Sequence, residues 1–181
     1  GVLSMFVRKN SYNLNFFSIL LFIILITTYV YATDYTISDG TTQTTRVTLT
    51  NSDTLTIDSG GTLDYYWPAV DADNRTFSSS STEVTNNGTI TGAGYLVDFR
   101  SSTNAKLVNN GTITATSSSR ALYINNSANT TITNNGTIQI SSSNAYEAID
   151  GDSTTDLTII NASGATISSA GDDAIAIASA E

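Results

Sequence analysis

The sequence contains neither cysteine nor histidine, and these two absences restrict the chemistry available to it. Without cysteine no disulfide framework can form, so packing and hydrogen bonds alone must hold the fold. Without either residue the chain has no cysteine- or histidine-based zinc site, no catalytic thiolate and no Ser-His-Asp triad. These absences exclude several enzyme classes, and we expect no catalytic residue, no metal site and no cofactor.

Charged residues are scarce, at 13% of the chain, and most of them are acidic. Two of the seven basic residues, Arg8 and Lys9, lie in the leader described below. The rest of the chain has 5 Lys or Arg against 16 Asp or Glu, a net charge of −11. Such a surface repels phosphate backbones, so we expect no nucleic-acid partner. Hydrophobic residues make up 40% of the sequence, enough to expect a folded chain.

The N-terminal segment, residues 1–32, is typical of a secretory signal peptide. Arg8 and Lys9 precede the apolar run Phe16–Ile26, and small residues lead to a cleavage site after Ala32. Met5 is the expected initiator. A retained membrane anchor is the alternative, although the apolar stretch is shorter than the roughly 20 residues of a spanning helix. We expect an exported protein, located at the cell surface, in the outer membrane or outside the cell.

The rest of the chain repeats itself. Five segments share the pattern apolar, any, small or Asn, any, Gly, Thr, apolar, with the looser last copy lengthened. Their leading apolar residues are Ile57, Val84, Leu107, Ile132 and Ile159, at spacings of 27, 23, 25 and 27. A second series of short β-type segments is centred on Leu96, Leu122, Ile149 and Ile175, at spacings of 26, 27 and 26. Two series with one period indicate a repeating structural coil.

This period predicts an all-β fold, a right-handed parallel β-helix with three short strands per coil of about 23–27 residues. We expect residues 33–55 to form an N-terminal cap and first coil, and residues 56–181 to form coils that continue beyond a truncated C-terminus. An isolated Asn-Gly would suggest a hairpin instead, so a β-sandwich is the alternative.

Each Asn-Gly is expected to supply the positive φ angles of a tight corner. Stacked coils lie about 4.8 Å apart, so equivalent residues should form ladders along the solenoid. The expected amide ladder consists of Asn87, Asn110 and Asn135. The expected apolar ladder consists of Ile90, Ile113, Ile138 and Ile167.

A leader followed by coils with Asn-Asn-Gly-Thr-Ile corners resembles the passenger domain of bacterial autotransporters (type V secretion), over about Ile57 to Ile177. The resemblance implies an exported cell-surface β-solenoid segment with a structural or adhesive role. Its implied partners are a surface polysaccharide or a protein of a host or neighbouring cell. Contact with the membrane is expected only through the signal peptide or through a C-terminal barrel beyond Glu181.

One interruption of the repeat is a candidate ligand-binding loop. Aromatic side chains and carboxylates often occur together in carbohydrate sites, and glycoside hydrolysis requires two carboxylates. The candidate residues are Tyr65, Tyr66, Trp67, Asp71, Asp73 and Arg75. The alternatives are that the aromatic residues pack over the N-terminal coil and that the charged ones are merely solvated. The alternative function is therefore a secreted carbohydrate-active β-helix, like a pectate lyase or glycosidase, or a carbohydrate-binding module.

Two acidic pairs, Asp150/Asp152 and Asp172/Asp173, supply oxygen ligands of the kind that Ca²⁺ binds. The glycine-rich calcium repeat is missing, so we interpret these residues as corner aspartates that end strands. Seven Asn-x-Ser/Thr sequons occur, of which three are by-products of the Asn-Gly-Thr corner.

Overall fold

The computed structural model describes residues 31–73 and 81–178. The chain divides into two units, residues 1–31 and 32–181, and the account below concerns the second. The predicted signal peptide lies outside the described residues except for its last two. Within the described ranges the regular structure consists of β-strands, and no helix there is long and apolar enough to cross a membrane.

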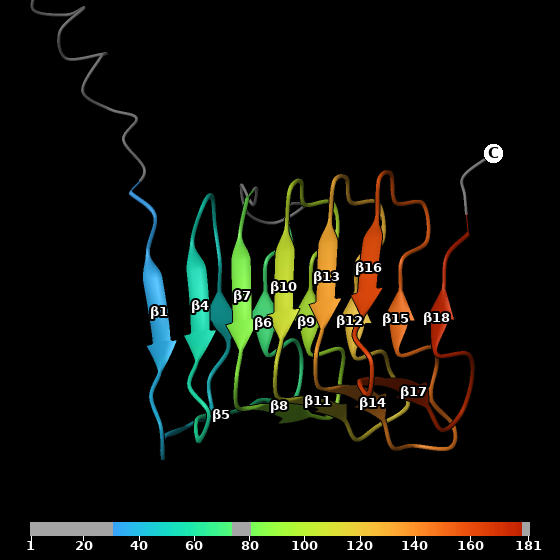
Figure 1. Ribbon diagram of the computed structural model, residues 1–181, viewed down its shortest axis with the longest axis horizontal. Helices are drawn as coiled ribbons and strands as arrows, with labels where there is room; N and C mark the ends of the chain where they lie inside the picture. Colours follow the sequence, from blue (N-terminus) through green and yellow to red (C-terminus); the bar gives the residue numbers. More distant parts are fainter. Residues whose placement is uncertain (1–30, 74–80, 179–181) are drawn as a thin grey trace, which may run out of the picture. The chain divides into compact units, whose positions relative to one another are not determined.

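Six successive coils each contribute one strand to each of three parallel sheets (Figure 1). The first sheet contains β1 (Asp34–Ile37), β4 (Thr54–Ile57), β7 (Glu83–Asn86), β10 (Lys106–Asn109), β13 (Thr131–Asn134) and β16 (Thr158–Asn161). The second contains β2 (Thr42–Gln43), β5 (Thr62–Asp64), β8 (Thr89–Gly92), β11 (Thr112–Ala115), β14 (Thr137–Ile140) and β17 (Thr166–Ser169). The third contains β3 (Val47–Thr48), β6 (Val70–Asp71), β9 (Val97–Asp98), β12 (Leu122–Tyr123), β15 (Ile149–Asp150) and β18 (Ile175–Ala176).

The predicted parallel β-helix with three strands per coil is confirmed. Every strand pairs in parallel with the equivalent strand of the next coil, as in the pairing of β10 with β7 and with β13. A sandwich of hairpins would require antiparallel pairs instead. The first coil, β1–β3, lies within residues 33–55.

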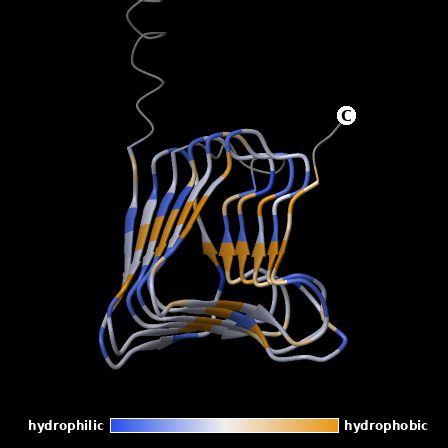
Figure 2. Cartoon of the chain, turned by 45° about the vertical axis from the view of Figure 1, so that its right-hand side comes forward, coloured by the Kyte–Doolittle hydropathy of each residue, from blue (hydrophilic) through white to orange (hydrophobic). Residues whose placement is uncertain are grey.

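Alternation of residue type explains why these short segments form strands. Along β4, Thr54 and Thr56 are half-buried while Leu55 and Ile57 are buried, and the same alternation recurs in β10, β11 and β13. Figure 2 shows the hydrophobic positions recurring from coil to coil. The predicted apolar ladder is confirmed by the register, which stacks Ile90, Ile113, Ile138 and Ile167.

The register of the third sheet differs from the predicted series by one residue. Leu122 pairs with Val97, not with Leu96, and Ile149 and Ile175 continue the row. Leu96 is also fully buried, so the apolar pattern alone could not distinguish the two residues.

The Asn-Asn corners carry two ladders where one was predicted. The predicted outer ladder is confirmed, since the Nδ2 of Asn110 donates to Asn87 at 2.8 Å and that of Asn135 donates to Asn110 at 2.7 Å. These side chains lie at the surface, where water competes for the same hydrogen bonds.

The inner ladder was not anticipated, and it is buried. It consists of the first asparagine of each corner, Asn86, Asn109 and Asn134, followed by the exposed Asn161. Each Nδ2 donates to the Oδ1 of the next asparagine at 2.7–2.8 Å and also to a backbone carbonyl of the next coil. In the first two coils the same position is occupied by Ile37 and Ile57. Asparagine can replace isoleucine there because each side-chain amide hydrogen-bonds to the equivalent asparagine of the next coil.

The expectation that the Asn-Gly corner uses positive φ angles is wrong. Among the described residues, the corner glycines Gly88, Gly111 and Gly136 are absent from the positive-φ set, as are the asparagines that precede them. These glycines are required by close approach instead. A Cβ on any of the three would lie 2.1–2.2 Å from the carbonyl oxygen of the corresponding glycine one coil earlier.

Replacing Asn109 by alanine should lower the free energy of unfolding by about 2–3 kcal/mol, because the amides on both sides lose a buried partner. Its neighbour provides a matched control, since Asn110→Ala removes the same side chain from the exposed ladder and should cost less than about 1 kcal/mol. Urea unfolding of both variants measures the difference. Equal losses would contradict a special role for the inner ladder.

Candidate functional site

The third sheet carries a row of polar residues on its outer side. Asp71, Asp98, Tyr123 and Asp150 are stacked in register, each directly after an apolar residue that belongs to the core. The three aspartates are nevertheless buried, and Asp98 is only 1% exposed. Other side chains therefore cover the outer face of this sheet.

The cover is an alternating stack of arginine and tyrosine side chains, which we call the Arg–Tyr stack. The Arg100 guanidinium lies between two rings, 5.1 Å from the centroid of Tyr95 and 4.7 Å from that of Tyr123. Arg120 lies between Tyr123, at 5.0 Å, and Tyr146, at 4.6 Å. These distances are within the range of cation–π attraction, so the stack links three successive coils outside the backbone ladder.

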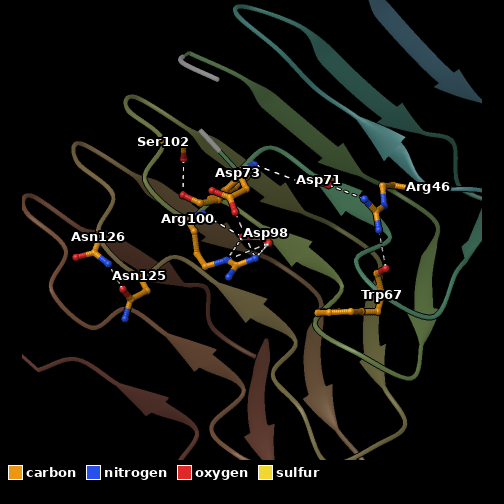
Figure 3. A network of polar contacts seen from close by, with 10 residues as sticks. Arg46, Trp67, Asp71, Asp73, Asp98, Arg100, Ser102, Asn125 and Asn126 are labelled. Atoms are coloured by element: carbon orange, nitrogen blue, oxygen red, sulfur yellow. Dashed lines mark hydrogen bonds and ion pairs between the residues drawn. The ribbon is translucent and has the colours of Figure 1, made fainter. Parts of the chain in front are cut away.

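Each arginine of this face is also paired with carboxylates. Arg100 approaches Asp98 at 2.5 Å and Asp73 at 3.3 Å. Figure 3 shows these three side chains close together. Arg120 bridges Glu147, at 2.7 Å, and Asp150, at 2.6 Å. In the first two coils, Arg46 contacts Asp71 at 2.9 Å. The arginines thus offset the negative charge of a face on which Asp71 and Asp98 stack in register.

Burial is the main influence on the pKa values of Asp98 and Asp150. It raises the pKa of Asp98 above the ordinary value of 3.8, against the opposing effect of the hydrogen bonds from Arg100. Burial likewise raises the pKa of Asp150, although the backbone N–H of Asp152 and the charge of Arg120 oppose the rise. The pKa of Arg100 is raised in turn, chiefly by its hydrogen bonds to Asp98, so the guanidinium remains charged.

Two exposed aromatic residues lie beside this row, and we call Tyr66 and Trp67 the aromatic platform. Tyr66 is 62% exposed and Trp67 is 45% exposed. The Trp67 ring meets Tyr95 edge to face, with centroids 5.4 Å apart, and its carbonyl accepts a hydrogen bond of 3.0 Å from Arg46 (Figure 3). A Cβ on Gly94 would lie 2.7 Å from the Cβ of Trp67, so this glycine allows the platform to pack closely on the next coil.

The platform separates two hollows. The charged pocket, of about 170 Å³, is lined by Arg46, Trp67, Pro68, Asp71, Asp73, Tyr95, Asp98 and Arg100. The aromatic pocket, of about 340 Å³, is lined by Tyr66, Trp67, Ala93, Gly94, Tyr95 and residues 117–119, all serines. Trp67 and Tyr95 belong to both, so a ligand at one pocket would lie next to the other.

The chain matches the family model described as the BigA third pectate lyase-like domain over residues 38–181. The chain belongs to this family. No curated protein and no solved structure matches the sequence.

For this member of the family, the structure brings together most of the predicted site. Trp67, Asp71 and Asp73 line the charged pocket, and Tyr66 lines the aromatic one. Tyr65 is half-buried and packs against the core, and it lines neither of these two pockets. Arg75 lies outside the described residues.

Sequence reasoning missed Arg46, Tyr95, Arg100 and the serine turn at residues 117–119. A signal was present, because the dipeptides Val70-Asp71, Val97-Asp98 and Ile149-Asp150 recur close to the coil period. A repeated aspartate on one face of stacked coils requires partners, and four of the five basic residues after the leader are arginines.

The aspartates considered as calcium ligands form ion pairs or hydrogen bonds within the chain. Asp150 pairs with Arg120 and accepts the backbone N–H of Asp152 at 3.1 Å, while Asp152 accepts that of Ala178 at 2.8 Å. Asp172 is exposed and accepts the N–H of Asp173 at 2.9 Å. In the described ranges, no cluster of three or more acidic residues is arranged to hold a metal ion.

Replacing Arg100 by glutamine should lower the free energy of unfolding at pH 7 by about 3 kcal/mol, because Asp98 is then left buried and unpaired. The folded pKa of Asp98 lies above its unfolded value, so the native state binds a proton first and the stability due to this group rises as the pH falls. Loss of the guanidinium raises that pKa further. The deficit of the variant should therefore shrink between pH 7 and pH 4 in urea unfolding (about the range where Asp titrates).

The control for this experiment is Lys106→Gln, which removes a cation from the exposed pair with Glu83. Its cost should stay below about 1 kcal/mol at both pH values. A deficit for Arg100→Gln that is constant with pH would contradict the assignment.

Proposed function

We propose that this chain is a rigid β-solenoid segment of an exported bacterial surface protein and that its role is adhesive. Family membership supports this proposal, because BigA is an autotransporter-like adhesin. The observation that carries it is the aromatic platform. Two adjacent large aromatic side chains are exposed and line one pocket of an acidic solenoid, and aromatic residues are typical anchors of binding surfaces.

The platform is held in place before any ligand arrives. Arg46 fixes the main chain at Trp67, Tyr95 packs against its ring, and Gly94 allows the close contact between coils. A side chain fixed in this way loses little further conformational freedom on binding, which favours affinity. The solenoid thus acts as a rigid support and the turn between β5 and β6 as its contact surface.

A carbohydrate-active enzyme is the second candidate, and one observation favours it. Asp71 and Asp98 are in register on adjacent coils, about 4.8 Å apart along the backbone, which is near the carboxylate separation of about 5 Å in retaining glycosidases. Both carboxylates, however, are buried and bonded to arginines. A nucleophile or acid must reach its substrate, so we assign these aspartates to structure.

The adhesive role is tested by binding the labelled full chain to cultured epithelial cells and to bacteria. The double variant Tyr66→Ala/Trp67→Ala should lose most of the binding, by about tenfold or more, because it removes both anchors. The control is Tyr35→Ala, which removes a tyrosine, 37% exposed, from β1 in the first sheet. Undiminished binding by the double variant, or no binding by the wild type, contradicts the proposal.

The enzymatic alternative is tested by incubating polysaccharides with the wild-type chain and with Asp71→Asn, which removes one of the two in-register carboxylates. We expect no cleavage by either, measured as reducing ends and as the absorbance of unsaturated products. Cleavage that is present in the wild type and lost in Asp71→Asn would support the enzyme and contradict the adhesive assignment of this face.

A further inference from the structure

The aromatic pocket is built by three successive coils. Tyr66 and Trp67 come from the second coil, Ala93, Gly94 and Tyr95 from the third, and the serine turn from the fourth. The middle coil contributes two small residues, which leave space between the aromatic rings on one side and the serine hydroxyls on the other. At about 340 Å³ the hollow is at the lower end of the range for small-molecule sites.

The lining of this pocket is chemically specific. None of its residues is charged, and it combines aromatic faces with hydroxyl groups. The Ser117 hydroxyl donates to the Ala93 carbonyl at 2.7 Å, which leaves its oxygen free to accept. The hydroxyls of Ser118 and Ser119 make no hydrogen bond within the described residues, so they are available to a ligand.

We propose that the aromatic pocket binds a neutral saccharide chain that runs along the solenoid axis. A pyranose ring presents C–H groups on its faces and hydroxyls around its edge. The Trp67 and Tyr66 rings match the faces, and the serine hydroxyls match the edge. This inference rests on the proposed function and names the class of ligand for the same platform.

The direction of the chain follows from the coil spacing. Successive coils lie about 4.8 Å apart, which is close to the length of one sugar unit in an extended β-1,4-linked chain. A chain parallel to the axis therefore places one ring over each coil, from the platform in the second coil to the serine turn in the fourth.

The charge distribution selects against acidic sugars. The wall formed by Trp67 and Tyr95 is shared with the charged pocket, which contains three aspartates and two arginines. The chain after the leader has a net charge of −11. A polymer of uronic acids would be repelled by this surface, whereas a neutral polymer is not.

The single tryptophan of the sequence makes binding measurable, because Trp67 lines the pocket and its emission responds to a ligand there. Trp67 also lines the charged pocket, so the Tyr66→Ala variant below assigns the response to the aromatic pocket, which alone of the two contains Tyr66. The full chain is titrated with the neutral probes cellohexaose and mannohexaose and with hexagalacturonate, an acidic chain of equal length. We expect at least one neutral hexasaccharide to shift Trp67 emission to the blue and to protect it from acrylamide. Hexagalacturonate should bind about tenfold more weakly or worse.

Two tyrosine variants complete the experiment. Tyr66→Ala, which opens the pocket, should weaken binding of the neutral probe by about tenfold. Tyr146→Ala removes a comparably exposed tyrosine (52%) that stacks on Arg120 outside the pocket, and it should leave the affinity unchanged. The inference is overturned if no neutral probe changes Trp67 emission, if hexagalacturonate binds equally well, or if both variants behave alike.

The cell-binding assay separates this inference from the proposed function. If the wild type binds cells through Tyr66 and Trp67 but no neutral hexasaccharide perturbs the tryptophan, the adhesive role stands and the saccharide assignment is wrong. If the wild type binds no cell at all, the proposed function itself fails.

Discussion

The in-register parallel pairing of coils is the constraint on which the rest of this structure depends. Backbone hydrogen bonds fix successive coils about 4.8 Å apart, so each side chain lies against its own counterpart. Apolar residues tolerate such self-contact without difficulty. Polar residues tolerate it only if they can satisfy one another, and charged residues only if something separates them.

The two buried polar rows of this protein meet that constraint differently. An amide is both donor and acceptor, so the inner asparagines bond to their own copies, and the row remains satisfied although Asn86, Asn109 and Asn134 are buried. A carboxylate is only an acceptor, so buried aspartates in a stacked row each require a cation as a partner. Arg46, Arg100 and Arg120 supply that charge, and the tyrosine rings hold the guanidinium groups of Arg100 and Arg120 in place.

Most of the fold could be predicted because it depends on spacing. The coil period, the three strands per coil, the outer amide ladder and the isoleucine ladder all follow from which residues recur. The inner ladder, the true role of Gly111 and the register of Val97 depend on where the backbone turns, which spacing does not specify. At the site, composition indicated the aromatic platform and Asp71, but Arg100 and Tyr95 contribute through contacts between coils that no single segment encodes.

In the third, fourth and fifth coils, the corner that precedes the third sheet varies in length while the other two corners stay constant. It occupies residues 93–96, 116–121 and 141–148 in the third, fourth and fifth coils, so it lengthens from four to six to eight residues. The corner that follows the third sheet stays at seven residues in the same coils. The spacings of 23, 25 and 27 residues in these three coils therefore differ through one corner, which in the fourth coil carries the serine turn. Insertions there leave the stacking of every ladder untouched, so this corner is where evolution, or an engineer grafting a new recognition loop, can change specificity without refolding the solenoid.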